Sequence, residues 1–222
     1  MRRILIATSN QGKLRDFSAA AAPHGIEVSA LPGFDSLPAA VEDGATFEAN
    51  ARKKAEHYSR LASGELVLAD DSGLEVEALG GAPGVHSARY GSLGSRGAVR
   101  GPGAALPHQN SDDAANNARL LRETASVADD RRGARFVCVI AAAVNGTTVG
   151  TFTGTARGLL LRGARGAGGF GYDPLFLVPE LGKTFAELTA EEKAAVSHRG
   201  QAFRRFLEWV ETGPSRSELR SG

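Results

Sequence analysis

Residues 66–79 read Leu-Val-Leu-Ala-Asp-Asp-Ser-Gly-Leu-Glu-Val-Glu-Ala-Leu, and this stretch decides the fold class. Its first four residues are apolar and predict a short buried strand that ends at Asp70. Its last six, from Leu74, alternate apolar and acidic side chains, as a half-buried strand does. Asp70-Asp71-Ser72-Gly73 between them has the composition of a type I turn, with Asp first and Gly fourth. Ligand-binding groups of α/β proteins are also placed where buried strands end, so this tetrapeptide is either a turn, which its composition taken alone predicts, or part of a site.

Strand and helix patterns alternate on both sides of this stretch. Before it, residues 4–8 and 26–31 predict strands, and residues 13–22 and 46–62 predict helices, the second with Thr46 as its N-cap. After it, residues 112–123 predict a helix, residues 135–144 and 147–152 a hairpin across Asn145-Gly146, and residues 155–161 a further strand. Two helices follow, beginning near Thr189 and Ser197. We therefore predict an α/β fold in which helices flank a central mixed sheet.

The composition is that of one globular domain spanning residues 1–222. Hydrophobic residues make up 42% of the chain and charged residues 23%. This composition excludes an intrinsically disordered chain, which would have few apolar residues and a high charge. A net charge of +1 argues against a sequence-independent nucleic-acid coat or a binder of anionic membranes. The chain has no apolar run of membrane-spanning length and only one cysteine, Cys138, inside an apolar segment. These features predict a cytoplasmic protein with a buried thiol.

Two segments predict irregular structure. Glycine and arginine are frequent between Gly91 and Gly103, without periodicity, so residues 91–111 are expected to form a flexible loop. The tail over residues 213–222 is expected to be frayed.

Two motifs point to functions that their context excludes, and zinc binding can be excluded as well. Residues 166–171 match G-x-G-x-x-G, but Pro174 follows closely and disfavours the helix that a dinucleotide-binding turn requires. Gly182-Lys183-Thr184 resembles the end of a P-loop, yet Leu177 stands where that loop needs glycine. The five histidines and the cysteine lack the paired spacing of a zinc site.

Several charged residues have both a structural and a chemical interpretation. Asp70 and Asp71, joined by Glu42, could supply the oxygen ligands that Mg²⁺ prefers. Lys13 follows Gly12 at a strand-to-helix turn, where it is either a solvated lysine or a phosphate ligand. The spacing around Lys54 favours an ordinary surface lysine.

Aromatic and basic residues nearer the C-terminus are equally ambiguous. His198 and Arg199 follow the predicted N-cap, so they are capping or surface residues, or they face an anion at a helix N-terminus. Phe170 and Tyr172 would ordinarily fold back on the core.

Considered together, these segments resemble the inosine-triphosphate pyrophosphatase family. The resemblance is carried by five motifs in order: residues 8–13 (Thr-Ser-Asn-Gln-Gly-Lys), 70–74 (Asp-Asp-Ser-Gly-Leu), 80–90 (Gly-Gly-Ala-Pro-Gly through Ser-Ala-Arg-Tyr), 169–174 (Gly-Phe-Gly-Tyr-Asp-Pro) and 186–199 (Ala-Glu-Leu through Ser-His-Arg). They span most of the chain.

The resemblance implies an elongated α/β subunit that forms a homodimer and acts in purine nucleotide metabolism. It implies Mg²⁺-dependent hydrolysis of deaminated purine nucleoside triphosphates (ITP, dITP and XTP) to the monophosphate and pyrophosphate. By the same resemblance, Asp71 is the general base and a metal ligand, and Glu42 is the other metal ligand. The implied phosphate and sugar contacts are Thr8, Ser9, Asn10, Gln11, Gly12, Lys13, Lys54, Ser72 and Lys193. The implied base pocket consists of Phe170, Gly171, Tyr172, Asp173, His198 and Arg199.

The chain departs from the family pattern at two places. The family usually has Glu immediately before Asn50, where this chain has Ala49, so either Glu48 compensates or that acid is dispensable. The family often has Asn after Lys193, where this chain has Ala194. Neither departure touches Asp71 or Lys193.

Three other functions remain as alternatives. A nucleotide sensor without hydrolysis would keep the pocket, although retention of the acidic residues argues against it. A pyrophosphatase for modified pyrimidine nucleotides would share much of the site. A nucleic-acid-binding protein could use scattered arginines without interleaved aromatics, namely Arg96, Arg100, Arg131, Arg132, Arg204 and Arg205.

Overall fold

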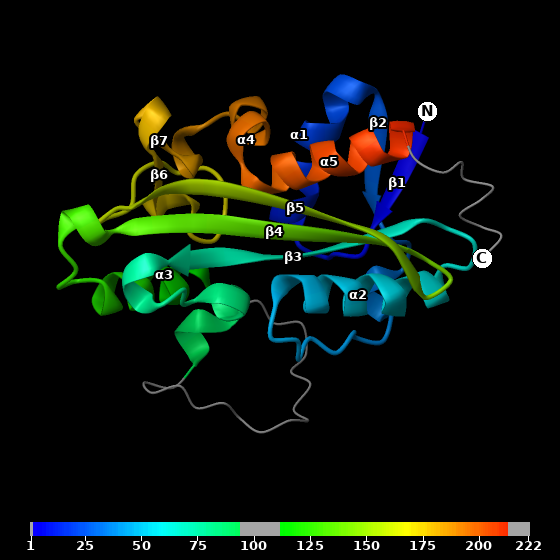
Figure 1. Ribbon diagram of the computed structural model, residues 1–222, viewed down its shortest axis with the longest axis horizontal. Helices are drawn as coiled ribbons and strands as arrows, with labels where there is room; N and C mark the ends of the chain where they lie inside the picture. The colour runs from blue at the N-terminus through cyan, green and yellow to red at the C-terminus, as the bar shows by residue number, and fades with distance from the viewer. Residues whose placement is uncertain (1, 94–111, 213–222) are drawn as a thin grey trace. The chain divides into compact units, whose positions relative to one another are not determined.

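The computed structural model describes residues 2–93 and 112–212, and within them seven strands form one sheet (Figure 1). The strand order is β2-β1-β3-β4-β5-β6-β7. β1 is parallel to β2 and β3, whereas β6 is antiparallel to β5 and β7, so the predicted mixed sheet and α/β class are confirmed. The strands are β1 (Arg2–Ile6), β2 (Ile26–Ala30), β3 (Val67–Val76), β4 (Gly133–Val144), β5 (Thr147–Leu160), β6 (Phe176–Val178) and β7 (Lys183–Thr184).

Five α-helices accompany the sheet in the described parts of the chain. They are α1 (Gln11–Ala21), α2 (Phe47–Leu61), α3 (Asp113–Glu123), α4 (Ala190–Val196) and α5 (His198–Thr212). Side-chain caps begin α1, α2 and α3, since Asn10 accepts from the Lys13 N–H, Thr46 from the Ala49 N–H and Asp112 from the Ala114 N–H. The predicted break at Ser197 is confirmed, because its Oγ accepts from the Gly200 N–H at 3.1 Å.

By their internal contacts the residues group into two compact units. The first contains Met1–Asp71, Cys138–Thr155 and Ala190–Gly222, and the second contains Ser72–Val137 and Ala156–Thr189. The strands β3, β4 and β5 contribute residues to both units.

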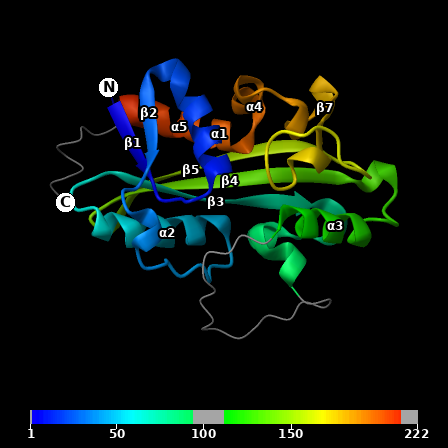
Figure 2. The same cartoon turned by 180° about the vertical axis from the view of Figure 1, so that it is seen from behind.

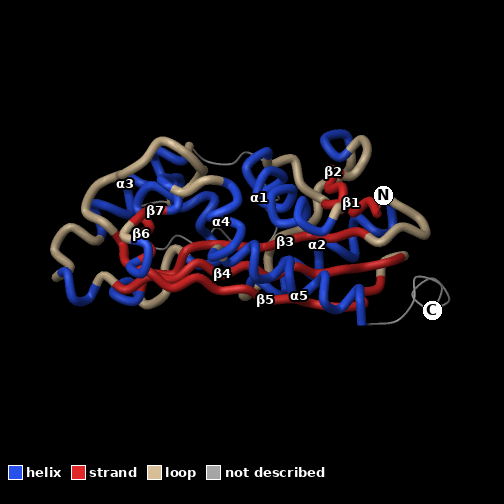
Figure 3. The backbone as a smooth tube through the Cα atoms, turned by 90° about the horizontal axis from the view of Figure 1, so that it is seen from above, coloured by secondary structure: helices blue, strands red, loops and turns tan. Residues whose placement is uncertain are grey.

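Helices cover both faces of the sheet in the first unit. The helices α1, α4 and α5 pack on one another on one face, and α2 lies on the other (Figures 1 and 2). Viewed from above in Figure 3, α5 lies over β4 and β5, where Phe206 meets Phe152 with ring centroids 5.5 Å apart. Phe17 of α1 packs against Phe203 of α5 in the same buried cluster. Cys138 lies in this core, as predicted.

Glycine lets α5 approach its neighbours closely. A side chain at Gly154 of β5 would collide with the carbonyl oxygen of His198, and one at Gly200 with the carbonyl oxygen of Ala194 in α4. The N-terminal turn of α5 is therefore held against both elements by backbone contact.

A smaller aromatic core stabilises the second unit. Phe136 of β4 contacts Phe176 and Phe185 with ring centroids 4.8 and 5.6 Å away. On α3, Arg119 lies over the Tyr90 ring and donates to the Tyr90 carbonyl at 2.7 Å.

The predicted turn at Asp70-Asp71-Ser72-Gly73 is wrong, because β3 continues through all four residues from Val67 to Val76. Local turn composition is overridden by strand pairing and by the buried partners of the two aspartates. The strand then ends at Val76, and Glu77–Leu79 forms a 3₁₀ turn where strand was expected.

The Asn-Gly hairpin is confirmed. Asn145 and Gly146 both have positive φ, 51° and 85°, and connect β4 to β5. β5 continues to Leu160 where two strands were expected.

Parts of the two predicted irregular segments lie outside the described residues. These are residues 94–111 of the expected loop and the tail 213–222. The start of the expected loop, Gly91 and Ser92, belongs to the 3₁₀ segment Gly84–Ser92. No helix among the described residues has the length and apolar character needed to cross a membrane.

Candidate functional site

The first cluster of predicted site residues surrounds Asp70, on the face of β3 covered by α1 and α5. Lys13 of α1 donates to Asp70 Oδ1 at 2.9 Å, and the Arg199 guanidinium of α5 lies 3.7 Å from Oδ2. Asp70 is 2% exposed, and although its burial opposes ionisation, the charges of Lys13 and Arg199 hold its pKa well below the usual range. Asp70 is therefore a charged, paired carboxylate that joins Lys13 to Arg199.

Asp16 of α1 extends this cluster to Lys193 of α4. The Lys193 ammonium lies 3.2 Å from both Asp16 carboxylate oxygens, and Arg199 donates to Oδ2 at 2.6 Å. Lys193 and Arg199 are both buried. Although burial opposes the charge of Arg199, Asp16 and Asp70 raise its pKa. The guanidinium is thus held in place by two carboxylates from different elements.

His198 begins α5 beside Arg199 and is also buried. Burial, followed by the charges of Arg199 and Lys193, holds the pKa of His198 well below its ordinary value. The imidazole is neutral near pH 7, where it can donate or accept a hydrogen bond without adding charge.

The second cluster surrounds Asp71, and its partners come from α2 on the other face of the sheet. Lys54 Nζ lies 3.1 Å from Asp71 Oδ1 and 3.1 Å from Glu42 Oε2. Asn50, one helical turn before Lys54, donates to Asp71 Oδ2 at 3.1 Å. Glu42 and Asp71 thus converge on one ammonium group.

Burial sets the ionisation of this second cluster. Burial raises the pKa of Asp71, and the opposing charge of Lys54 does not cancel the effect. Burial alone would lower the pKa of Lys54, but Asp71 and Glu42 hold it above its ordinary value.

The two clusters carry opposite charge. Around Asp70, three cations (Lys13, Lys193 and Arg199) face two carboxylates, which leaves a net positive group suited to an anion. Around Asp71, two carboxylates face one ammonium, which leaves a net negative group suited to a cation. No group of three or more histidine, cysteine or acidic residues that could hold a metal occurs among the described residues. A cation here would have two carboxylate ligands, which suits Mg²⁺, since it keeps several of its waters.

The loop over residues 8–13 forms the start of α1. Asn10 caps the helix, accepts from the Lys13 N–H at 3.0 Å and donates its own N–H to Thr8 Oγ1 at 3.2 Å. Ser9 and Gln11 are exposed beside them, and Gly12 is buried. The loop therefore presents a helix N-terminus next to the Lys13 ammonium, an arrangement that binds anions.

The remaining predicted residues belong to the second unit. Ser72 is half-buried in β3. Tyr172 donates through its hydroxyl to the Ser87 carbonyl at 2.8 Å, and Asp173 Oδ2 accepts from the Phe170 N–H at 2.9 Å. Gly171 has a φ of 60° and is bound through its N–H to Asp113. Through these two hydrogen bonds, Tyr172 and Asp173 hold the shape of the loop over residues 170–173.

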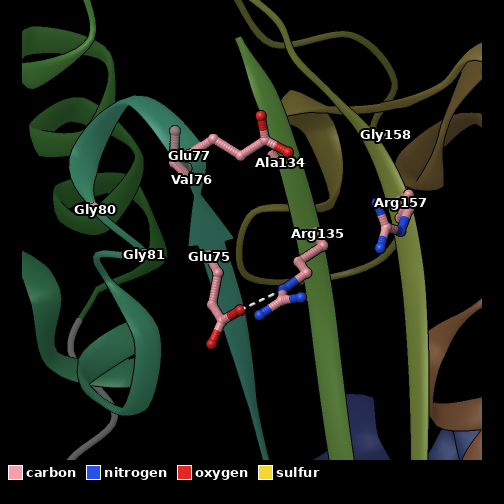
Figure 4. A pocket seen from close by; sticks show the side chains of 9 residues that line it. All are labelled: Glu75, Val76, Glu77, Gly80, Gly81, Ala134, Arg135, Arg157 and Gly158. Carbon is pink, nitrogen blue, oxygen red and sulfur yellow. Dashed lines mark hydrogen bonds and ion pairs between the residues drawn. The ribbon is translucent and has the colours of Figure 1, made fainter. Parts of the chain in front are cut away.

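A cavity of about 360 Å³ opens in the second unit between β3, β4 and β5 (Figure 4). Its charged lining includes Glu75, Arg135 and Arg157, and an ion pair joins the first two. None of the predicted site residues lines this cavity.

Several interpretations can now be assessed. Lys54 is buried and paired, so the surface lysine that its spacing favours is wrong, whereas Lys53 is exposed and pairs with Asp43. Glu48 pairs with Arg52 on the exposed side of α2, so its contacts give no support to the alternative that it replaces the acid missing at position 49.

The excluded nucleotide-binding motifs behave as expected. Asp173–Leu175 is a 3₁₀ turn followed by β6, where a dinucleotide-binding turn would have a helix. Lys183 and Thr184 form β7, where a P-loop would begin a helix.

Sequence reasoning missed two residues of the site, Asp16 and Asn50. Each lies about one helical turn from a predicted residue, Lys13 and Lys54 respectively, and this spacing is the signal that could have found them.

Comparisons with known proteins show which family this chain belongs to. The model of the Ham1 family matches residues 4–209. A protein from Geobacillus kaustophilus called "dITP/XTP pyrophosphatase" is 45% identical over 98% of this chain and 100% of its own length. One of the same name from Ralstonia nicotianae is 50% identical over 94% of this chain and 96% of its own.

Solved structures extend the agreement to three dimensions. The Staphylococcus aureus Ham1 protein matches with a TM-score of 0.74 and 37% identity, covering 95% of this chain and 98% of its own. The Mycobacterium abscessus nucleoside-triphosphatase, or dITP/XTP pyrophosphatase, matches with a TM-score of 0.65 and 39% identity, covering 92% and 98%. The resemblance inferred from the five motifs is confirmed, and the chain belongs to the Ham1 family.

Proposed function

We propose that this chain hydrolyses deaminated purine nucleoside triphosphates (ITP, dITP and XTP) to the monophosphate and pyrophosphate, and so removes them from the nucleotide pool. The observation that carries the proposal is the opposite charge of the two clusters that Asp70 and Asp71 organise from one strand. A triphosphate with its divalent cation needs both kinds of site within reach of each other. Although their partners lie on opposite faces of the sheet, the two clusters are close enough to interact, since the charge of Lys13 also acts on Asp71 and that of Lys54 on Asp70. The names of the relatives support the same substrate class.

Asp71 is the general base of this proposal. Its burial raises its pKa, so its carboxylate is a stronger proton acceptor than an exposed one. It orients a water and accepts its proton as the water oxygen bonds to the α-phosphorus. The bond from the α-phosphorus to the bridging oxygen breaks, and pyrophosphate leaves.

The cationic residues bind and neutralise the phosphates. Two of these cations are Lys13 of α1 and Lys193 of α4. The third, Lys54, pairs with Asp71, the proposed general base. Together with the helix N-terminus formed by residues 8–13, they stabilise the charge that develops on the leaving group.

Glu42 and Asp71 are the residues that would hold Mg²⁺. Both carboxylates already converge on the Lys54 ammonium, so they form an oxygen donor pair arranged around a positive charge. Bound there, the ion would neutralise phosphate charge and polarise the phosphate oxygens.

Selectivity rests on hydrogen bonding to the base. A 6-keto purine has an acceptor where adenine has an amino donor, so a buried donor such as Arg199 or His198 favours the former. Phe170, Gly171, Tyr172 and Asp173 are proposed to complete the base pocket, with Ser72 as a phosphate or sugar contact. We further propose a cytoplasmic homodimer, testable by light scattering after size exclusion.

The nucleic-acid alternative is disfavoured because the guanidinium groups of three of its arginines form hydrogen bonds within the protein. Arg132 is buried and donates to Thr124 and Leu160, and Arg204 donates to backbone carbonyls at the end of α4. Arg205 donates to the Thr153 carbonyl of β5.

The test is incubation with Mg²⁺ and, separately, ITP, dITP, XTP, GTP, ATP and dUTP, with ³¹P NMR of the products. Pyrophosphate released fastest from the deaminated purines supports the proposal. Orthophosphate would indicate a phosphatase, preference for dUTP a pyrimidine enzyme, and binding without product a sensor.

A further inference from the structure

The loop that carries Glu42 lacks helix or strand from Pro38 to Gly44 and is held by side chains of α2. The Ala40 N–H donates to the Tyr58 hydroxyl at 3.3 Å, whereas the pair of Asp43 with Lys53 is exposed and contributes little to holding the loop. The Gly44 N–H donates to Asn50 Oδ1 at 2.7 Å. The position of Glu42 therefore depends on contacts with α2.

Asn50 is the member of this set that also reaches Asp71. Its Oδ1 accepts from Gly44 while its Nδ2 donates to Asp71 Oδ2 at 3.1 Å, and the residue is 2% exposed. The amide orientation follows from its partners, since a backbone N–H only donates and a carboxylate only accepts. Aspartate, which has the same shape, would lose the donor and set one carboxylate against another.

Gly44 is matched to this contact. A Cβ at position 44 would lie 2.6 Å from Asn50 Oδ1 and 2.9 Å from Ala49 Cβ, closer than such atoms approach. Glycine is required here for space, so that its N–H can reach the amide of Asn50.

Asn50 and Lys54 thus span the same two acidic segments from successive turns of α2. Lys54 does so through charge, which has little directionality, whereas the hydrogen bonds of Asn50 are directional. We propose that Asn50 is a positioning residue that fixes the Glu42 loop and the Asp71 carboxylate relative to each other for cation binding and base catalysis, an inference that rests on the proposed function. Replacing a residue that hydrogen-bonds to a metal ligand typically lowers metal affinity by about 10- to 100-fold.

The test compares Asn50→Ala, Asn50→Asp and Gly44→Ala with wild type in two measurements. The first is Mg²⁺ binding to the nucleotide-free protein by calorimetry, and the second is kcat and KM for ITP. We expect each variant to bind Mg²⁺ at least about 10-fold more weakly. We also expect kcat to fall about 100-fold with little change in KM, because displaced catalytic groups affect the transition state most.

The double variant Gly44→Ala/Asn50→Ala isolates the proposed contact. If both residues act through one hydrogen bond, its effect on Mg²⁺ affinity equals that of the larger single change, whereas independent roles would add. Additivity would overturn the coupling of the loop to Asp71.

The matched control is Asn116→Ala in α3. Asn116 is also 2% exposed, and its Oδ1 accepts from the N–H of a glycine, Gly91, at 2.6 Å, while its Nδ2 donates to the Ala88 carbonyl. It should lose comparable stability and keep Mg²⁺ affinity and kcat. Folded Asn50 variants that match this control would overturn the proposal while leaving the proposed function intact.

The two proposals can fail separately. If wild type releases no pyrophosphate from any nucleotide, the proposed function fails, and calorimetry still reports whether Asn50 governs the cation site. If Asn50→Ala does not fold, Asn50→Asp and Gly44→Ala carry the test, and wild-type Mg²⁺ affinity in either one rejects the role.

Discussion

Asp70 and Asp71 are consecutive residues of one strand, and their carboxylates have partners on opposite faces of the sheet. Asp70 pairs with Lys13 of α1, and Asp71 pairs with Lys54 of α2. The two-residue period of a strand separates the side chains in this way. Their ionisation differs accordingly, because charged partners lower the pKa of Asp70 while burial raises that of Asp71. One dipeptide therefore provides an anchored anion and, in the proposed mechanism, the proton acceptor.

Replacing Asp71 with asparagine tests the base. Asp71→Asn keeps the shape of the side chain and should lower kcat for ITP by about 10² to 10⁴, the range for a positioned acid or base, while the protein still binds nucleotide. Pyrophosphate release and calorimetric nucleotide binding measure the two effects. Asp43→Asn, at an exposed carboxylate of the same loop as Glu42, is the control. Near-normal turnover of Asp71→Asn would refute the role.

Replacing Lys54 tests the carboxylate pair. In Lys54→Met, Glu42 and Asp71 face each other without a cation, so the free energy of unfolding should fall by about 3 kcal/mol in the presence of a metal chelator. Added Mg²⁺ should restore part of this loss because it binds the folded state. Urea unfolding with and without Mg²⁺ measures both.

The adjacent lysine is the control for that experiment. Lys53→Met removes an exposed ion pair and should change stability by no more than about 1 kcal/mol, with no added response to Mg²⁺. Equal effects of the two substitutions would contradict the buried role of Lys54.

Replacing Arg199 tests base selectivity. Arg199→Gln removes the charged donor that Asp16 and Asp70 hold in place, so the ratio of kcat/KM for ITP to that for ATP should fall at least about tenfold. Arg205→Gln, at an exposed position of the same helix, is the control. An unchanged ratio in Arg199→Gln would place discrimination elsewhere.

His198 predicts a pH dependence of stability. Its folded-state pKa is held well below the ordinary value of 6.5, so the unfolded chain takes up a proton near pH 6.5 that the folded protein does not. The contribution of the neutral His198 side chain to the free energy of unfolding is therefore complete above that pH and is lost as the pH falls below it. The wild-type loss of stability between pH 7 and pH 5 should exceed that of His198→Asn by up to about 2 kcal/mol, as measured by urea unfolding. Equal losses would show that His198 is not responsible.

The fold was predictable where local signals agree with tertiary structure. Asn145-Gly146 specifies its own turn, and Ser197 and Thr46 cap the helices expected of them. At residues 70–73 the local signal fails, because the turn composition reflects buried ionic partners that the sequence pattern does not place nearby.

The site was predictable only in part for a related reason. Lys54 pairs with Asp71, 17 positions away, and Asp16 contacts Lys193 and Arg199, which are 177 and 183 positions away. No short-range spacing encodes such contacts. The family resemblance supplied Lys54, Lys193 and Arg199, while the only local signal for Asp16 and Asn50 is their helical spacing from Lys13 and Lys54.

The uninterrupted course of β3 also limits how the gene can change in length. Adding or deleting one residue between Val67 and Asp70 would turn the side chains of Asp70 and Asp71 to the opposite faces of the sheet. The two carboxylates would then exchange their environments. Asp71, which pairs with Lys54, would then face α1 and α5, and Asp70 would face α2. We therefore expect insertions and deletions to accumulate in surface connections and to be purged from this strand, even where hydrophobicity is conserved.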